Sequence, residues 1–292
     1  MNIKELRYFH DLVIHKNFSK VADHFGVTQP TITMAIQRLE NDVGAPLFIR
    51  SQSHHELTVT PGGLQFDRHV QTILSELEVA HLELTRAKQD RIRFGLPPII
   101  GNYFFPAYTP ALLDAGLLQR LEVDDHGSSE LTRLLQKGVI DIALLGSLTP
   151  LHQDAFLTQV ITKAPLQIIV APNHPLARTT GVHFKELTHE RFITLADEYV
   201  HAQAFKQAIR TAGIRPKVAF ETHDVHVLKT LVAKNAGIGF LTTLAIDPSD
   251  NLITIPLLDP GAPEFFVSVA TRANRILSVP GQALWDLLVK RN

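Results

Sequence analysis

The segment between Thr60 and Asp90 constrains the fold most, because it predicts one long, uninterrupted helix. Thr60 can cap this helix, with Pro61 at the first helical position, where an N–H group would have no partner in any case. Beyond Gly63, its apolar residues alternate in spacing between four and three: Phe66, Val70, Ile73, Leu77, Ala80, Leu84 and Ala87. This pattern predicts either pairing with a second chain or packing of the helix on its own domain. The helix therefore separates an N-terminal module from a larger C-terminal part.

The residues before this helix predict a small helical module. Apolar spacing of three and four predicts a helix over residues 3–16, and Ser19 can cap a second helix of two turns. Gly26 ends that helix, and Thr28 can cap a third one, in which Pro30 is tolerated in the first turn. The third helix directs one apolar stripe inward, formed by Ile32, Ala35, Ile36, Leu39 and Val43. A short helix, a tight turn and a second helix are typical of the helix-turn-helix motif.

The opposite face of the third helix carries side chains that can read DNA bases. Gln29, Thr33, Met34 and Gln37 can contact base edges or thymine methyl groups, and no long acidic side chain interrupts them. Residues 47–50 and 57–60 are two short extended runs joined by a polar tip, which predicts a β-hairpin wing that places Arg50 near a phosphate. The alternative is a generic three-helix bundle with a solvated helix face.

After Asp90 the pattern changes to alternating strands and helices. Apolar runs at 91–96, 121–123, 141–145, 166–171, 192–195, 217–221, 238–241 and 265–271 predict strands, and the segments between them predict helices. Such alternation predicts an α/β sheet that is covered on both faces, arranged as two lobes joined by crossing strands. The expected domains are residues 1–60, a linker helix over 61–89 and a domain over 90–292. Within that domain, lobe I covers about 90–161 and 265–292, and lobe II about 162–264.

Composition excludes several classes of protein. The 292 residues include no cysteine, which excludes disulfide scaffolds, cysteine-ligated metals and thiol chemistry. The net charge of −1 does not indicate a globally basic nucleic-acid binder, and six basic residues balance six acidic ones within residues 1–60. Any DNA binding therefore depends on where charges lie, on helix N-termini and on oligomerisation. Motifs for phosphate-binding loops, serine hydrolases and zinc peptidases are absent, so an enzyme is not expected.

A family resemblance follows from the order and spacing of the N-terminal residues. They are Leu6-Arg7-Tyr8-Phe9, Phe18-Ser19, Ala22, Val27-Thr28-Gln29-Pro30-Thr31-Ile32-Thr33, Ile36, Arg38-Leu39-Glu40, Gly44, Pro46-Leu47-Phe48, Arg50, Leu57-Thr58 and Thr60-Pro61-Gly62-Gly63. This module resembles that of the LysR-type transcriptional regulators. Looser similarity at Phe94-Gly95, Gly127, Gly138–Ala143 and Ala236–Leu241 extends the resemblance over essentially the whole chain.

The resemblance implies an α/β fold with an N-terminal all-α winged helix-turn-helix, a dimerising linker helix and a two-lobed, periplasmic-binding-protein-like effector domain. Such regulators bind imperfect palindromes in double-stranded DNA as homodimers or homotetramers. They respond to a small-molecule effector, which is expected to be a metabolite here. One interpretation of the sequence makes this metabolite an anion. If the protein is an activator, it would also contact RNA polymerase. No cofactor, metal or membrane partner is expected. The charged N-terminus and short apolar runs favour a cytoplasmic protein.

The expected DNA contacts lie on the third helix and the wing. They are Thr28, Gln29, Pro30, Thr31, Thr33, Met34, Gln37, Arg38 and Arg50. Thr33 stands where serine is frequent in the family and keeps the hydroxyl. Met34 stands where a long polar or basic side chain is common, so an apolar contact, for example with a thymine methyl group, is expected to replace one phosphate or base contact, and operator preference stays open. Arg38 and Arg50 are phosphate candidates, with surface ion pairing to Glu40 or Asp42 as the alternative. His54 and His55 are expected to be polar surface at the wing tip.

The expected effector contacts lie between the lobes, near the carboxyl ends of the strands. They are Pro98, Ile99, Ile100, Ser128, Ser129, His201, Thr222 and His223. Ser128 and Ser129 open a helix and suit an anion, with simple N-capping as the alternative. Pro97 and Pro98 offer few donors, which favours a less polar ligand or one that is held from the other lobe.

Two questions stay open from the sequence. His201 and His223 either make effector binding pH-dependent or are ordinary structural and surface residues. The pair His223 and His226 has metal-ligand spacing but no identifiable third ligand. An α/β enzyme, a solute-binding protein and a dimeric adaptor without DNA binding are the competing functions.

Overall fold

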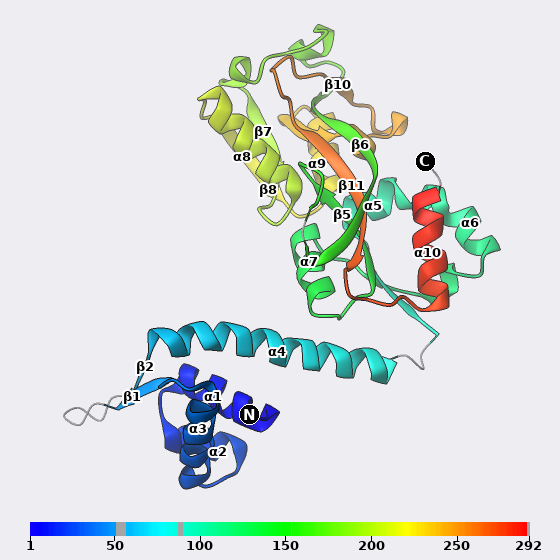
Figure 1. Cartoon of the computed structure of the whole chain (residues 1–292). Helices are drawn as coiled ribbons and strands as arrows, with labels where there is room; N and C mark the ends of the chain where they lie inside the picture. Colours follow the sequence, from blue (N-terminus) through cyan, green and yellow to red (C-terminus); the bar gives the residue numbers. More distant parts are fainter. Residues whose placement is uncertain (51–56, 87–89, 153, 291–292) are drawn as a thin grey trace. The chain divides into compact units, whose positions relative to one another are not determined.

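A computed structural model describes residues 1–50, 57–86, 90–152 and 154–290 (Figure 1). The chain divides into two compact units, Met1–Arg86 and Ala87–Asn292, and each is described by itself. No helix in the described ranges combines the length and the apolar character needed to span a bilayer.

The first unit is a helical domain with a two-stranded wing. Its elements are α1 (Ile3–His15), α2 (Phe18–Phe25), α3 (Gln29–Val43), β1 (Phe48–Arg50), β2 (Leu57–Val59) and α4 (Pro61–Arg86). The N-cap of α2 is Asn17, whose side chain accepts a hydrogen bond from the N–H of Lys20, so the expectation that Ser19 caps this helix is wrong. Asparagine at this position satisfies a free N–H as well as serine does, and the helix starts earlier than a cap at Ser19 would allow.

Helix α4 packs on its own domain over its first turns, as one of the two alternatives predicted, whereas pairing with a second chain stays a prediction. The Thr60 hydroxyl accepts the N–H of Gly63 at 2.8 Å, so Thr60 caps the helix as expected. Phe66 and Val70 pack into the core of the first unit. The apolar side chains further along the stripe are exposed instead: Ile73 by 42%, Leu77 by 37% and Leu84 by 76%. The first turns of α4 therefore belong to the domain core, and the later turns present an apolar stripe.

The second unit is an α/β structure built on one mixed sheet. Its strands are β3 (Ile92–Gly95), β4 (Leu121–Asp124), β5 (Ile142–Ser147), β6 (Phe156–Val170), β7 (Arg191–Leu195), β8 (Lys217–Thr222), β9 (Ile238–Thr242), β10 (Ile253–Ile255) and β11 (Glu264–Arg272). Its α-helices are α5 (Pro98–Tyr103), α6 (Thr109–Asp114), α7 (Ser128–Gln136), α8 (Val200–Ala212), α9 (Val225–Ala233) and α10 (Val279–Lys290). The strand order is β4-β3-β5-β11-β6-β9-β7-β8, and β10 also pairs with β6.

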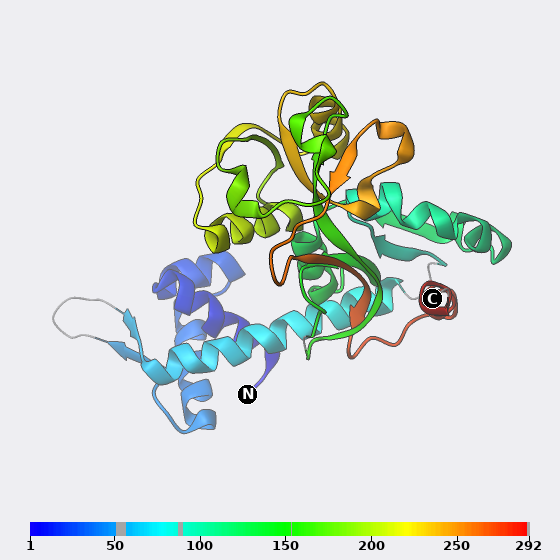
Figure 2. The ribbon, with the colours of Figure 1, turned by 90° about the horizontal axis from the view of Figure 1, so that it is seen from above.

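Strands β6 and β11 connect the two lobes (Figures 1 and 2). β6 runs antiparallel to β11 from Phe156 to Pro165 and then pairs with β9 from Leu166 onward, so one strand serves both lobes. The sequence predicted only its second half, because exposed residues alternate with buried ones in the first half and conceal the apolar signal. The crossing strands confirm the predicted two-lobed architecture. They also bring the ends of β3, β4 and β7, with the loops that follow them, to the boundary between the lobes.

Candidate functional site

The outward face of α3 is exposed, as the sequence predicted. Gln29, Met34 and Gln37 are exposed and Thr33 is half-buried, whereas the opposite stripe, including Ile32 and Leu39, is buried. The buried stripe fixes the helix against α1 and α2, so the polar face is held in one orientation. Exposed amide and hydroxyl groups on a rigid helix are the chemistry that reads base edges in a major groove.

Thr28 starts α3 without capping it through its side chain. Its backbone is extended and it occupies the N-cap position, but its hydroxyl contacts the hydroxyl of Thr31 at 2.9 Å instead of a backbone N–H. The predicted side-chain cap is therefore wrong. Pro30 and Thr31 complete an exposed first turn. Because no side chain caps this turn, the positive end of the helix dipole is open to an anion such as a phosphate.

Arg38 has an ion-pair partner that the sequence did not reveal. Its Nε lies 3.1 Å from Oε1 of Glu5, a carboxylate only 6% exposed, while the arginine side chain is 61% exposed. Glu5 also accepts the N–H of Asn2 in a capping box at the start of α1. The expected alternative partner Glu40 instead accepts the N–H groups of Leu47 and Phe48. The Nε of Arg38 is thus held by Glu5, while most of the arginine side chain faces solvent.

The wing is present, with β1 and β2 antiparallel and Arg50 opposite Leu57 in the register. The side chain of Arg50 lies outside what the structure describes, as do His54 and His55 at the tip. Their expected roles stay predictions.

In the second unit, the starts of three helices line one small cavity. The cavity measures about 20 Å³, and its walls are Pro97, Pro98, Ile99, Ile100, Gly127, Ser128, Tyr199, Val200, His201 and Phe265. It combines residues from α5, α7 and α8 with the start of β11, which lie far apart in the sequence. Six of the eight expected effector residues belong to this cavity or to the hollow beside it. A volume of this size holds about one water molecule.

His201 is the polar group of this cavity that lacks a partner. The residue is 3% exposed, its ring centroid lies 5.0 Å from that of Phe265, and its Nε2 has no hydrogen bond. Burial lowers the pKa of His201 to about 3, so the imidazole is neutral near pH 7. An unpaired buried nitrogen of this kind costs free energy unless a ligand or water satisfies it.

Ser128 does not cap α7; it joins the helix to the sheet. Its Oγ accepts the N–H of Gly146 in β5 at 2.8 Å, and the N-cap position belongs to Gly127. The hydroxyl proton of Ser128 and the first-turn N–H groups of α7 remain as donors. Ser129 is exposed, and with Ser128 and Gln203 it lines a neighbouring hollow of about 460 Å³.

Thr222 and His223 lie outside the cavity lining and contact the loop before α8. The carbonyl of Thr222 accepts the N–H of Ala196 at 3.0 Å, and the carbonyl of His223 accepts the hydroxyl of Tyr199 at 2.5 Å. The His223 ring pairs with Glu198, whereas that of His226 meets the hydroxyl of Tyr103. The two histidines thus engage different partners, and their spacing does not gather them around one point.

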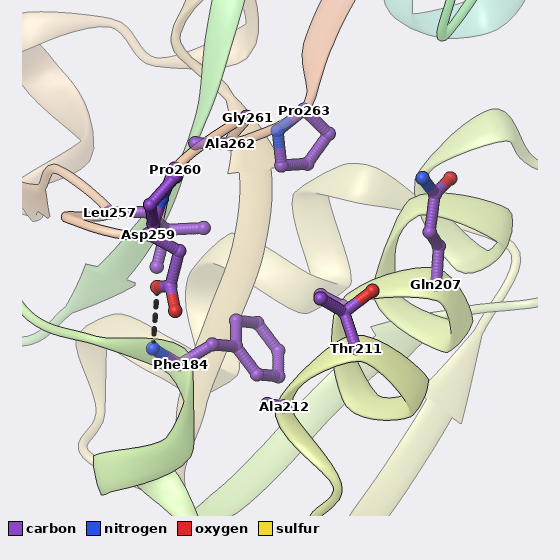
Figure 3. A pocket seen from close by; sticks show the side chains of 11 residues that line it. Phe184, Gln207, Thr211, Ala212, Leu257, Asp259, Pro260, Gly261, Ala262 and Pro263 are labelled. Carbon is purple, nitrogen blue, oxygen red and sulfur yellow. Dashed lines mark hydrogen bonds between the residues drawn. The ribbon is translucent and has the colours of Figure 1, made fainter.

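A second cavity of about 50 Å³ lies between α8 and the segment before β11, and sequence reasoning missed it (Figure 3). Phe184 and Leu257 provide apolar walls, and Gln207 and Thr211 lie along α8. Its carboxylate, Asp259, is already engaged, since it accepts the N–H of Phe184 at 2.7 Å. The carboxylate of Asp259 is therefore occupied by a hydrogen bond within the fold.

Comparison with known proteins supports the two parts of the chain separately. The family model of the bacterial regulatory helix-turn-helix protein, lysR family, matches residues 3–64, and that of the LysR substrate-binding domain matches residues 85–292. The malolactic fermentation system transcriptional activator of Lactococcus lactis is 32% identical over 289 residues, which cover 99% of this chain and 98% of the relative.

Solved structures show the same fold. Full-length BenM superposes with a TM-score of 0.55 at 24% identity, over 99% of this chain and 96% of that one. The regulatory domain of CcmR from Synechocystis PCC6803, solved in complex with 2-PG, gives 0.60 at 20% identity, over 68% and 96%.

These relatives are transcriptional regulators, not enzymes, and the matched family models are a DNA-binding domain and a substrate-binding domain. In this chain the first domain carries the exposed α3 face, and the second contains the cavity between the lobes. The chain belongs to the LysR family of bacterial transcriptional regulators, with a helix-turn-helix DNA-binding domain followed by an effector-binding domain.

Proposed function

We propose that the protein binds an imperfect palindrome as a homo-oligomer in the cytoplasm and changes its regulatory activity when a small organic acid enters the cavity between the lobes of the second unit. The observation that carries the ligand part is the unpartnered Nε2 of His201, buried where three helices begin. The exposed polar face of α3 supports the DNA part.

Three features of the cavity support a carboxylate ligand. Helices α7 and α8 have no side-chain cap, so their first-turn N–H groups and positive dipole ends are available to an anion. Neutral His201 donates one hydrogen bond without bringing a second charge. Pro97, Ile99 and Ile100 supply an apolar wall for the carbon skeleton. The Lactococcus relative is named as activator of a malolactic fermentation system, and malic and lactic acids are carboxylates of this class.

The size of the cavity implies that ligand entry separates the lobes. A Cβ added at Gly127 would lie 3.2 Å from the carbonyl oxygen of Glu198, so the starts of α7 and α8 already approach closely. A space for about one water molecule cannot hold a carboxylic acid of several carbons. Movement of the lobes about β6 and β11 would then couple ligand binding to the arrangement of subunits in the oligomer.

Exposed apolar residues support the oligomer. The outer strands of the sheet, β4 and β8, expose Val123 by 52%, Val218 by 46% and Phe220 by 49%. Unpaired edge strands with apolar side chains are pairing surfaces. The exposed stripe on α4 offers a second surface. An oligomer would carry two or more DNA-binding units, and their combined contacts would compensate for the weak DNA affinity expected of one N-terminal module without net charge. As an activator, the protein would also contact RNA polymerase.

A footprinting experiment on the DNA upstream of the protein's own gene tests the DNA part. We expect a protected region with two half-sites and an affinity that falls as salt rises. An unprotected upstream region at low salt would contradict the proposal.

Thermal stabilisation by a panel of small organic acids tests the ligand part. We expect at least one acid to raise the melting temperature of the wild-type protein and to do so less for Ser128→Ala. Thr188→Ala is the matched control, because its hydroxyl donates a hydrogen bond to the nearby carbonyl of Lys185 at the surface. An equal shift in all three proteins would exclude Ser128 from the site.

A further inference from the structure

Two histidines and one aspartate from α1 and α2 converge on one point of the first unit. Asp11 and His15 lie one turn apart on α1, and His24 lies in the last turn of α2. One ligand atom from each of the three lies within 4.8 Å of the other two. Among the described ranges of the chain, this is the one group of three such side chains.

The distances suit a shared cation better than a set of hydrogen bonds. His24 Nδ1 lies 3.0 Å from Asp11 Oδ2, and His15 Nε2 lies 3.6 Å from Asp11 Oδ1. The first distance is that of a hydrogen bond, but the second is too long for one. Zinc bonds of about 2.0–2.2 Å in a tetrahedral site place neighbouring ligand atoms roughly 3.3–3.6 Å apart. His24 lies near Oδ2 and His15 near Oδ1, so the two imidazoles must shift until one carboxylate oxygen lies at that separation from both.

The local electrostatics also favour a cation. Both histidines lie in the final turns of their helices, where unpaired carbonyl groups carry partial negative charge. The side chain of Asp11 is only 12% exposed, so its charge is weakly screened by solvent. The ring of His24 lies against that of Phe25, with centroids 4.8 Å apart, which limits how far the imidazole turns away.

We propose that Asp11, His15 and His24 bind one divalent transition-metal ion of the zinc class. Two imidazoles and one carboxylate suit zinc, nickel or cobalt and are a poor set for magnesium, which prefers oxygen ligands. Three protein ligands leave a fourth position for water. His24 is 60% exposed, so the ion enters directly from solution. The bound ion links α1 to α2, and α2 precedes the DNA-reading helix, so binding stabilises the module that reads DNA.

Calorimetric titration of the tag-free, chelator-treated full chain with zinc chloride tests the site, with magnesium chloride as the negative probe. We expect one equivalent of zinc to bind, with at least tenfold weaker affinity in His15→Gln and in His24→Gln. Cobalt chloride provides a second readout, because the visible absorption of a tetrahedral cobalt ion reports its ligands directly.

His10→Gln is the matched control. His10 forms a similar pair with a carboxylate, at 2.8 Å from Asp67, but belongs to no group of three such side chains in the described ranges. Retained affinity in His10→Gln together with the loss in His24→Gln supports the site. Unchanged zinc affinity in His24→Gln, or no saturable binding of one equivalent to the wild type, overturns it. Circular dichroism checks folding, and the exposed position of His24 makes its variant the decisive one should His15→Gln not fold.

Discussion

The imidazole of His201 lies against the ring of Phe265, with centroids 5.0 Å apart and planes tilted by 30°. Phe265 belongs to β11, the strand shared by both lobes, and it packs directly on Gly146, where an added Cβ would lie 2.5 Å from its ring. The N–H of Gly146 in turn bonds to Ser128. A chain of contacts thus runs from the first turn of α8 to the first turn of α7. A ligand that engages His201 and Ser128 would act on both ends of this chain.

The buried His201 predicts acid sensitivity of the second unit. The pKa of His201 falls from 6.5 to about 3 in the folded chain, so between these values the unfolded chain binds a proton that the folded one does not. This group therefore contributes little pH dependence well above pH 6.5, and the free energy of unfolding falls by up to about 1.4 kcal/mol per pH unit between about pH 6.5 and 3.

Urea unfolding between about pH 4.5 and 7.5, within the window where the two states differ in bound protons, measures this slope through the fluorescence of the single tryptophan, Trp285 in α10. His201→Leu should flatten the profile, and His223→Gln, which changes an exposed ring, should keep it. Parallel profiles for wild type and His201→Leu would show that His201 does not carry the effect.

A second prediction concerns base reading by Gln29. This side chain is exposed in the first turn of α3, and one amide contact to a base contributes about 1–3 kcal/mol of discrimination. Gln29→Ala should weaken binding to the specific operator about 10- to 100-fold and leave binding to unrelated DNA nearly unchanged. Gel-shift titrations with both DNAs measure the ratio, and Asn41→Ala, exposed near the end of α3, is the control. Equal losses on both DNAs would remove Gln29 from the base-reading set.

Features that depend on neighbouring residues in the sequence could be predicted, whereas features that depend on tertiary contacts could not. The helices of the first unit depend on apolar spacing within a few residues, so their existence was predictable. The cavity segments followed from a general rule, that loops after parallel strands meet at one edge. Ion pairs and hydrogen bonds between individual side chains could not be predicted from the sequence. Arg38 meets Glu5 because α3 packs beside α1, and no local pattern shows that.

The roles of individual site residues also depended on tertiary structure. Ser128 was expected to bind ligand or to cap α7, but its hydroxyl reaches Gly146 in β5. His201 was an expected effector contact, but only the fold shows that it is buried without a partner for its Nε2. Asp11, His15 and His24 span two helices with no known motif spacing, so only the packing of α1 on α2 brought them together.

A third prediction concerns the exposed stripe of α4. Leu77 lies on this stripe, 37% exposed and among other exposed apolar residues, so it is available to a second copy of the chain. Leu77→Asp should raise the dissociation constant of the oligomer at least tenfold, since it places a charge in an apolar contact. Ser75→Asp introduces the same side chain at an exposed position off the stripe and should have little effect. Sedimentation at several concentrations measures both, and an unchanged constant for Leu77→Asp would exclude the stripe as an interface.

The last prediction uses two adjacent glycines in the first turn of α4. A Cβ at Gly63 would lie 2.4 Å from the carbonyl oxygen of Leu47, whereas a Cβ at Gly62 would meet nothing closer than 3.7 Å. Gly63→Ala therefore forces α4 away from the start of the wing and should destabilise the first unit by about 1–3 kcal/mol, the usual range for overpacking. Gly62→Ala should instead stabilise it by up to about 1 kcal/mol, because alanine favours the helix. Urea unfolding followed by far-ultraviolet circular dichroism separates the two. Effects of the same sign would mean that the backbone contact between α4 and Leu47 does not require glycine.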